Sequence, residues 1–161
     1  AYVAQRFGNQ AVQESSPAVW ITIAGSRGSG LKKPLPAGNI RVYERDKASE
    51  TFIGESRIGH TAAGHKIDIS IGRAFDVSAN RIQTSFQRFG EREAEVGYRI
   101  EMTNDKPESV VVSVEEQLTG DWTIISESQK GTKRDSMTYV FELKVPSQSI
   151  AELEYSVRFK W

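Results

Sequence analysis

The sequence predicts an all-β chain built from one or two antiparallel β-sandwiches, and three observations support this prediction. Apolar and polar side chains alternate with a period of two in many short runs, whereas helical periodicity is almost absent. Turn-forming residues punctuate these runs at short intervals. The chain has no cysteine, and its 161 residues can bury a core without disulfides or a metal.

The clearest alternating runs lie at 67–71, 96–102, 110–114, 139–145 and 153–161. In each run one face is apolar and the other polar, as in antiparallel sheets that pack face to face. Each run is therefore predicted to be a strand with one buried face. Shorter candidate strands are Val19–Ala24, Ile40–Glu44, Phe52–Ile58, Phe75–Val77, Ile82–Phe86 and Trp122–Ile125.

The predicted domain boundary lies near Phe89-Gly90, where the sign of the charge changes. Residues 1–90 contain 12 Lys/Arg and 7 Asp/Glu, a balance of +5, whereas residues 91–161 contain 9 and 14, a balance of −5. We expect residues 1–90 to form a β-rich N-terminal part. Residues 91–161 are expected to form a small immunoglobulin- or fibronectin-like sandwich, which shares packing with the first half because it is short for a complete domain of this type.

Residues 1–36 are expected to include mobile loops and a strand cut from a larger domain. The Gly/Ser-rich stretch 25–33 predicts an exposed loop, and the polar residues of 5–17 predict a mobile connection. The strand around Tyr2-Val3-Ala4 is expected to add to a sheet edge in this or a neighbouring molecule. The start at Ala1 suggests a removed upstream part, whereas alternation up to Trp161 suggests an intact C-terminus.

Three positions have a structural explanation in the sequence alone. Pro36 and Gly38 predict a turn before the strand at Ile40, because proline fixes φ and glycine tolerates positive φ. Gly72, between Ile71 and Arg73, predicts a bulge or sharp bend between two strands. Trp122, which follows a Gly-Asp turn, is predicted to be a core aromatic.

The two histidines, His60 and His65, are the best candidates for a metal site. Such a site would need both imidazoles on one side together with a carboxylate such as Glu55 or Asp68. Glycines flank both histidines, so an exposed hairpin loop is the favoured interpretation, and no metal ligand is assigned.

Other catalytic and phosphate-binding patterns are weak. Glu91, Glu93 and Glu95 alternate at the start of a strand, which predicts one solvated face rather than the two opposed carboxylates of a glycosidase. The glycines of 25–33 lack the Gly-Lys-Ser/Thr of a phosphate loop, and Pro34 follows directly. No Gly-x-Ser-x-Gly motif is present, so we assign no catalytic or cofactor-binding residue.

Several ordered motifs resemble the C-terminal region of the bacterial domain of unknown function 4139 family. The resemblance covers about residues 17–161 and implies an exported or envelope-associated protein that is preceded by a longer N-terminal part. It carries no catalytic residues. The motifs are Pro34–Tyr43, Phe52–Ile58, Gly72–Val77, Gln83–Phe86, Met102–Asn104, Gly120–Trp122 and Tyr155–Trp161.

The sequence therefore predicts a non-catalytic β-sandwich module of a larger bacterial protein, which mediates protein–protein or assembly contacts at the cell envelope. One alternative is a glycan-binding module that uses aromatics such as Trp20, Tyr43 and Trp161; another is an accessory domain of an enzyme whose active site lies upstream. A protein partner or self-association is expected. Nucleic acid is not, because the basic residues are scattered. No apolar run is long enough for a transmembrane segment, and no cofactor is assigned.

Overall fold

The computed structural model describes residues 2–7, 12–23, 33–45 and 49–161, and these residues form thirteen strands and no helix. The strands are β1 (Tyr2–Phe7), β2 (Val12–Ser15), β3 (Ala18–Ile23), β4 (Gly38–Arg45), β5 (Glu50–Ile58), β6 (Ile67–Arg73), β7 (Val77–Arg88), β8 (Glu93–Asn104), β9 (Val110–Gln117), β10 (Asp121–Glu127), β11 (Thr132–Lys133), β12 (Thr138–Val145) and β13 (Ser149–Lys160). The predicted all-β class is confirmed.

The chain divides into two compact units, and one of them is discontinuous in sequence. Residues 1–2 and 18–73 form the insert unit, and residues 3–17 and 74–161 form the sandwich unit. Phe89 and Gly90, where a boundary was predicted, lie in the turn between β7 and β8. The N-terminal segment 3–17 thus folds with strands that follow the insert unit in the sequence.

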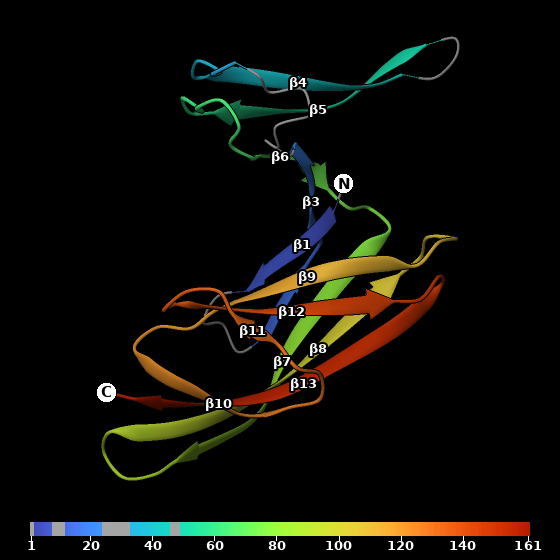
Figure 1. Cartoon of the computed structure of the whole chain (residues 1–161). Helices are drawn as coiled ribbons and strands as arrows, with labels where there is room; N and C mark the ends of the chain where they lie inside the picture. Colours follow the sequence, from blue (N-terminus) through green and yellow to red (C-terminus); the bar gives the residue numbers. More distant parts are fainter. Residues whose placement is uncertain (1, 8–11, 24–32, 46–48) are drawn as a thin grey trace. The chain divides into compact units, whose positions relative to one another are not determined.

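The sandwich unit has two sheets (Figure 1). One is antiparallel, with the strand order β10-β13-β8-β7-β2, and is called the five-stranded sheet. The other contains β11, β12, β9 and β1 in that order. β1 runs parallel to β9, with Val3 opposite Val112 and Phe7 opposite Glu116, whereas β12 and β11 are antiparallel. The predicted antiparallel sandwich is confirmed, with the parallel β1–β9 pair as an exception among the described strands.

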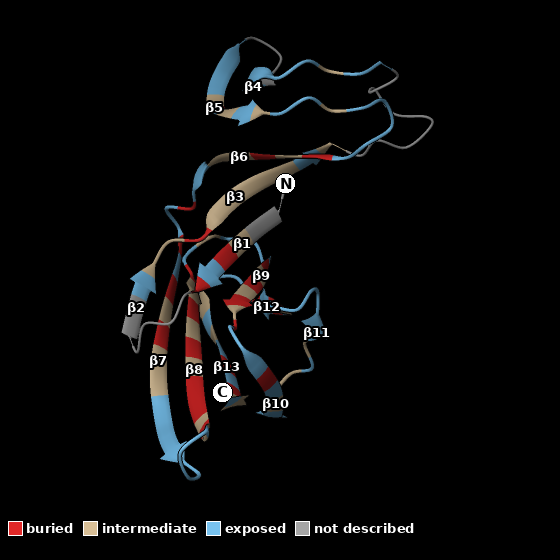
Figure 2. Ribbon diagram, turned by 90° about the vertical axis from the view of Figure 1, so that its left-hand side faces the viewer, coloured by how far each residue is buried: buried red, intermediate tan, exposed pale blue. Residues whose placement is uncertain are grey.

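The core of the sandwich unit comes from the alternation predicted from the sequence. Along most of β8, β9, β12 and β13 every second residue is buried and the residues between are partly or wholly exposed (Figure 2). Gly97 and Thr138 are exceptions, since both are buried out of phase. Each fully buried Val, Leu, Ile or Phe side chain stabilises the fold by about 1.5–3 kcal/mol. Trp122 is also buried, as predicted, and its indole N–H donates to the Ser136 carbonyl at 2.8 Å. Fully buried core residues are Ile100, Met102, Val112, Val114, Phe141, Val145, Leu153 and Val157.

The insert unit contains two strand pairs. β3 pairs with β6 antiparallel, and the register shifts at Ile71, next to Gly72, whose φ is 137°. The predicted bulge is therefore present, but it lies within β6 and not between two strands. β4 and β5 form an antiparallel pair. A Cβ at Gly54 of β5 would lie 2.6 Å from the Ile71 carbonyl oxygen, so glycine permits the close approach of β5 to β6.

Two predictions about individual segments were wrong. Phe75–Val77 and Ile82–Phe86 are not separate strands, because a single β7 begins at Val77 and Phe75 is 98% exposed before it. The segment 5–17 is not simply a mobile connection, since it contains the end of β1 and all of β2. Among the described residues, no helix has the length and apolar character to cross a membrane.

Candidate functional site

The two histidines lie in the connection between β5 and β6, and both are exposed. This connection is not the predicted hairpin, because β5 pairs with β4 and β6 pairs with β3. The structure does not bring His60 and His65 together with carboxylates: over the described ranges, no three His, Cys, Asp or Glu side chains gather in a way that could hold a metal ion.

The two carboxylates considered as partners of the histidines are engaged on their own strand pairs. Glu55 accepts from the Arg41 Nε at 2.6 Å, across the β4–β5 hairpin. Asp68 accepts from the Thr22 hydroxyl at 2.6 Å and lies 3.0 Å from the Lys66 ammonium. The Thr22 hydrogen bond lowers the pKa of Asp68. Both carboxylates therefore support pairing within the insert unit.

The predicted glutamate row is part of an ion-paired surface. Glu91 lies in the turn before β8, and Glu93 and Glu95 lie on the outer face of that strand. The Arg158 guanidinium is 3.5 Å from Glu93 and 2.9 Å from Glu95. Partly exposed pairs of this kind contribute at most about 1 kcal/mol each, so this surface is solvated and structural.

The aromatics proposed for glycan binding differ in their exposure. Trp20 is half-buried, whereas Trp161 is exposed. Tyr43 and Phe52 are about half exposed, at 50% and 54%, and form a T-shaped pair with ring centroids 5.6 Å apart.

Of the predicted loop 25–33, residues 25–32 lie outside the described residues.

The free edge of β7 is the feature of the sandwich unit best suited to contact another chain. β2 pairs only with residues Ala79–Ile82 of β7, whereas β8 pairs with β7 along almost its whole length. Among the described strands, none pairs with Gln83–Arg88 on the side opposite β8. This distal part of β7 is exposed from Thr84 onward (Figure 2).

The direction of the main-chain groups along this edge follows from two hydrogen bonds. The Phe89 N–H donates to the Glu93 carbonyl at 2.8 Å, and the Trp161 N–H donates to the Arg92 carbonyl at 3.1 Å. Hydrogen-bonded pairs alternate along an antiparallel ladder. Counting back from Phe89, the main-chain groups of Gln87 face β8, and those of Phe86 and Arg88 point away from it.

An exposed apolar side chain lies on the same stretch of edge. Phe86 is opposite the buried Val96 in the register, so it continues the apolar inner face of the sheet, yet 62% of it is exposed. An added strand would bury part of this ring. The Arg88 side chain donates to the carbonyls of Gly90 and Glu91, which fixes the adjacent turn.

The opposite edge of the five-stranded sheet, β10, contains a register shift, as β7 does between Gln83 and Ser85. The shift in β7 leaves Thr84 as an extra residue just before Phe86–Arg88. A register shift between Ile124 and Ser126 interrupts its ladder with β13 and leaves Ile125 as an extra residue. Bulges of this kind are one way in which edge strands resist further pairing. Nearby, the Lys133 ammonium lies 4.3 Å from the centre of the Trp122 ring.

A buried polar cluster lies between the two sheets, and the sequence analysis missed it. The Arg81 Nε of β7 donates to Glu116 Oε1 of β9 at 3.1 Å, and both side chains are at most 2% exposed. The guanidinium also donates to the Tyr155 hydroxyl at 3.3 Å and lies 3.6 Å from the centre of the Tyr98 ring. The ring centre of Phe7, on β1, lies 5.8 Å from the guanidinium carbon.

Burial disfavours the charged groups of this cluster, yet attraction to Glu116 and Tyr155 outweighs burial for Arg81, whose pKa is raised. For Glu116, burial prevails. It raises the pKa of Glu116, although the Arg81 charge opposes this shift. Burial and the Glu116 charge also raise the pKa of Tyr155 well above its usual value. Because Arg81 belongs to β7 and Glu116 to β9, the arrangement joins the two sheets.

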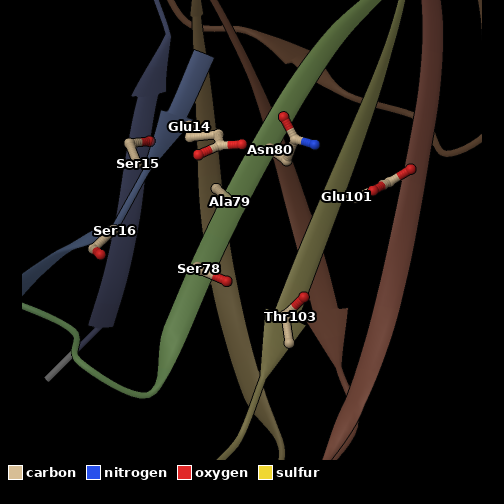
Figure 3. A pocket seen from close by; sticks show the side chains of 8 residues that line it. All are labelled: Glu14, Ser15, Ser16, Ser78, Ala79, Asn80, Glu101 and Thr103. Carbon is tan, nitrogen blue, oxygen red and sulfur yellow. The ribbon is translucent and has the colours of Figure 1, made fainter. Parts of the chain in front are cut away.

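A polar pocket of about 500 Å³ lies where β2, β7 and β8 meet (Figure 3). Glu14, Asn80 and Glu101 share one row of the sheet, since Glu14 is opposite Asn80 and Asn80 is opposite Glu101. Ser15 Oγ and Asn80 Oδ1 are buried and have no hydrogen-bond partner among the described atoms. The contact between β2 and β7 is therefore imperfectly satisfied.

The comparisons with known proteins give no match: no family model, no curated protein and no solved structure matches the chain. The resemblance to the domain of unknown function 4139 family therefore depends only on the motifs quoted above. Function is inferred from the geometry of the two units.

Proposed function

We propose that this chain is a non-catalytic assembly module that binds an extended protein segment as an additional strand at the free edge of β7. The observation that carries the proposal is the outward direction of the Phe86 and Arg88 main-chain groups, which have no strand partner in the described part of the chain. β-strand addition uses such unpaired N–H and C=O groups for affinity and adjacent side-chain contacts for specificity.

The side chains around the edge support this assignment. Phe86 offers apolar area to an inward side chain of the incoming strand, and burial of such area contributes about 25 cal/mol per Å². The nearby Gln83, Thr84, Ser85 and Gln87 are uncharged, so they impose no like-charge repulsion on a partner. The resemblance suggests the bacterial cell envelope as the place where such contacts form.

The experiment that tests the proposal is selection from a displayed library of random dodecapeptides against the whole chain. Peptides selected by the free edge should lose affinity for Arg88→Pro, which lacks the outward N–H, and keep it for Arg88→Ala, which retains that group. Equal binding to both variants, or a library that yields no binder, would contradict the proposal.

Amide hydrogen exchange of the same complexes provides a second readout. In the free protein the amides of Phe86 and Arg88 should exchange faster than that of Gln87, whose N–H faces β8. A bound peptide should slow exchange at Phe86 and Arg88 only. The matched side-chain variants are Phe86→Asp, expected to abolish binding, and Ile125→Asp on β10, expected to leave it unchanged.

A glycan-binding module is the second candidate, and the exposed Tyr43–Phe52 pair of the β4–β5 hairpin favours it. Aromatic rings that are exposed in pairs offer apolar faces on which a sugar ring can stack. A glycan array probed with the whole chain would test this: a ligand lost in both Tyr43→Ala and Phe52→Ala supports it, and signals that never exceed background reject it.

A further inference from the structure

The segment Val3–Pro17 completes both sheets of the sandwich unit. Its first part, in β1, pairs parallel with β9, and its second part, β2, pairs antiparallel with β7. Its two partner strands within the sandwich unit, β9 and β7, belong to residues 74–161, which follow the insert unit in the sequence. A single N-terminal segment thus contributes one strand to each of the two sheets.

The seat of this segment is specific. Phe7 is fully buried against the Arg81 guanidinium, and Gln5 is also buried. On the outer side, the Arg6 guanidinium donates to Glu115 Oε2 at 2.9 Å. Apolar, polar and charged contacts therefore all favour binding of this segment in this register.

The same seat holds every buried side-chain oxygen or nitrogen that lacks a hydrogen-bond partner in the described part of the chain. Ser15 Oγ belongs to the segment itself, Asn80 is the register partner of Glu14, and Glu116 is the register partner of Phe7. A buried polar group without a partner costs about 1–3 kcal/mol. Parallel pairing is also slightly weaker per residue than antiparallel pairing, and β2 has only four residues.

Only one covalent connection has to rearrange when this segment is exchanged, namely the link from the insert unit to β7. The segment is continuous in sequence with the insert unit, and the chain enters the rest of the sandwich unit only at Ala74–Asp76, between β6 and β7. This connection is short, and its Phe75 is 98% exposed. Short hinge loops favour domain swapping, which reuses the same contacts between copies.

We propose that Val3–Pro17 is an exchangeable element, so that the seat on β9 and β7 of one molecule takes the equivalent segment of a second copy of this chain. The contacts at the seat are the same in the closed and the exchanged forms, so exchange costs no specificity. The incompletely satisfied seat lowers the barrier to release of the segment. This inference does not depend on the free edge at Phe86 and Arg88.

Cysteine crosslinking of the whole chain tests the exchange, because the sequence contains no cysteine of its own. Ala4 and Ser113 are register partners, and neither is fully buried. Adjacent strands lie about 4.8 Å apart, within the range that a disulfide can span. The double variant Ala4→Cys/Ser113→Cys should form an intramolecular disulfide when it is oxidised at low concentration.

The decisive sample is a mixture of the two single variants, incubated at high concentration and then oxidised. Exchange predicts a covalent dimer that contains the 4–113 disulfide, identified by peptide mass spectrometry, at several-fold the yield from Ala4→Cys mixed with Thr123→Cys. Thr123 is exposed on β10 and serves as the control for random collision. A yield equal to that of the control pair overturns the proposal.

Variants at the seat provide the directional check. Ser15→Ala removes a buried hydroxyl without a partner and should slow the appearance of the 4–113 dimer, whereas Phe7→Ala loosens the segment and should accelerate it. A rate that neither variant changes would also contradict the proposal. Loss of peptide binding by Arg88→Pro concerns the free edge alone, so the two proposals can fail separately.

Discussion

Glu115 and Glu116 are neighbours on β9, but they lie in opposite environments. Glu115 points outward and pairs with Arg6 and Arg134, whose side chains are partly exposed. Glu116 points inward, is fully buried, and pairs with Arg81 at 3.1 Å. Because successive side chains of a strand point to opposite faces, a shift of one residue determines whether a carboxylate is screened by water or depends on one buried partner.

The largest expected effect follows from removal of the buried carboxylate. Glu116→Ala leaves the Arg81 guanidinium buried without its ionic partner, and loss of one member of a buried pair costs about 3–5 kcal/mol. Glu115→Ala should cost about 1 kcal/mol or less, because its partners can turn to water. Urea unfolding of the wild type and both variants gives the two free energies.

The core tryptophan Trp122 provides a fluorescence signal from the sandwich unit, although Trp20 and Trp161 also contribute. Near-ultraviolet circular dichroism of the same samples therefore serves as an independent probe of the transition. If Glu115→Ala and Glu116→Ala lower the free energy of unfolding by the same amount, the two carboxylates do not lie in the different environments that the structure indicates.

A smaller effect is expected when the whole buried cluster is replaced by apolar groups. The triple variant Arg81→Met/Glu116→Leu/Tyr155→Phe removes both charges and the hydroxyl that the guanidinium contacts. Replacement of a buried ion pair by apolar residues of similar size is often neutral or stabilising. We therefore expect the free energy of unfolding of the triple variant to lie within about 2 kcal/mol of the wild-type value. It should be clearly higher than that of Glu116→Ala.

A triple variant as unstable as Glu116→Ala would show that the charges contribute more than their burial costs. The same variant also bears on the further inference, because it changes the surface under Phe7. Its 4–113 crosslinking yield should be measured beside its stability, so that a change in exchange is not mistaken for unfolding.

The sequence predicted most strands of the sandwich because period-two alternation reports one buried face directly. It did not identify the buried pair, although a signal is present. Arg81 follows Val77 and Ala79 in the inward phase of β7, and Glu116 follows Val112 and Val114 in that of β9. A basic residue in the inward apolar row of one strand and an acidic residue in that of another could have indicated an internal ion pair.

The discontinuous unit and the parallel pair could not be predicted in this way. Alternation describes a strand but not its neighbour, and the polar residues of Val12–Ser15 resemble a loop. β2 is a strand because β7 offers it a ladder, which is a tertiary effect. The free edge of β7 could not be predicted from the sequence either, because whether a strand has a free edge depends on which strands lie beside it.

The pH dependence of stability sharpens the comparison of the two glutamates. Burial raises the pKa of Glu116 in the folded protein, whereas an unfolded chain titrates near about 4.3. The folded state then binds this proton more tightly than the unfolded state does. Its contribution to the free energy of unfolding is therefore fully present below the unfolded pKa and is lost as pH rises through the folded pKa. Relative to Glu116→Gln, the wild type should lose stability as pH rises from about 4.

Urea unfolding at steps of pH measures this difference, and Glu116→Gln provides a reference that cannot titrate at the same position. A difference that instead grows with pH would mean that attraction to Arg81 outweighs burial, and that the folded carboxylate has a lowered pKa. The corresponding comparison for Glu115→Gln isolates the outward carboxylate, because it uses the same strand and the same chemistry.

The smallest expected effect is the response to salt. The Debye length falls from about 10 Å at 0.1 M to about 3 Å at 1 M, so added sodium chloride weakens pairs that face water far more than buried ones. The cost of Glu115→Ala should therefore decrease between these concentrations, while the cost of Glu116→Ala should stay nearly constant. Urea titrations of both variants at the two salt concentrations compare the costs directly; a salt response at Glu116 as large as that at Glu115 would place solvent beside Arg81, where the structure has Phe7.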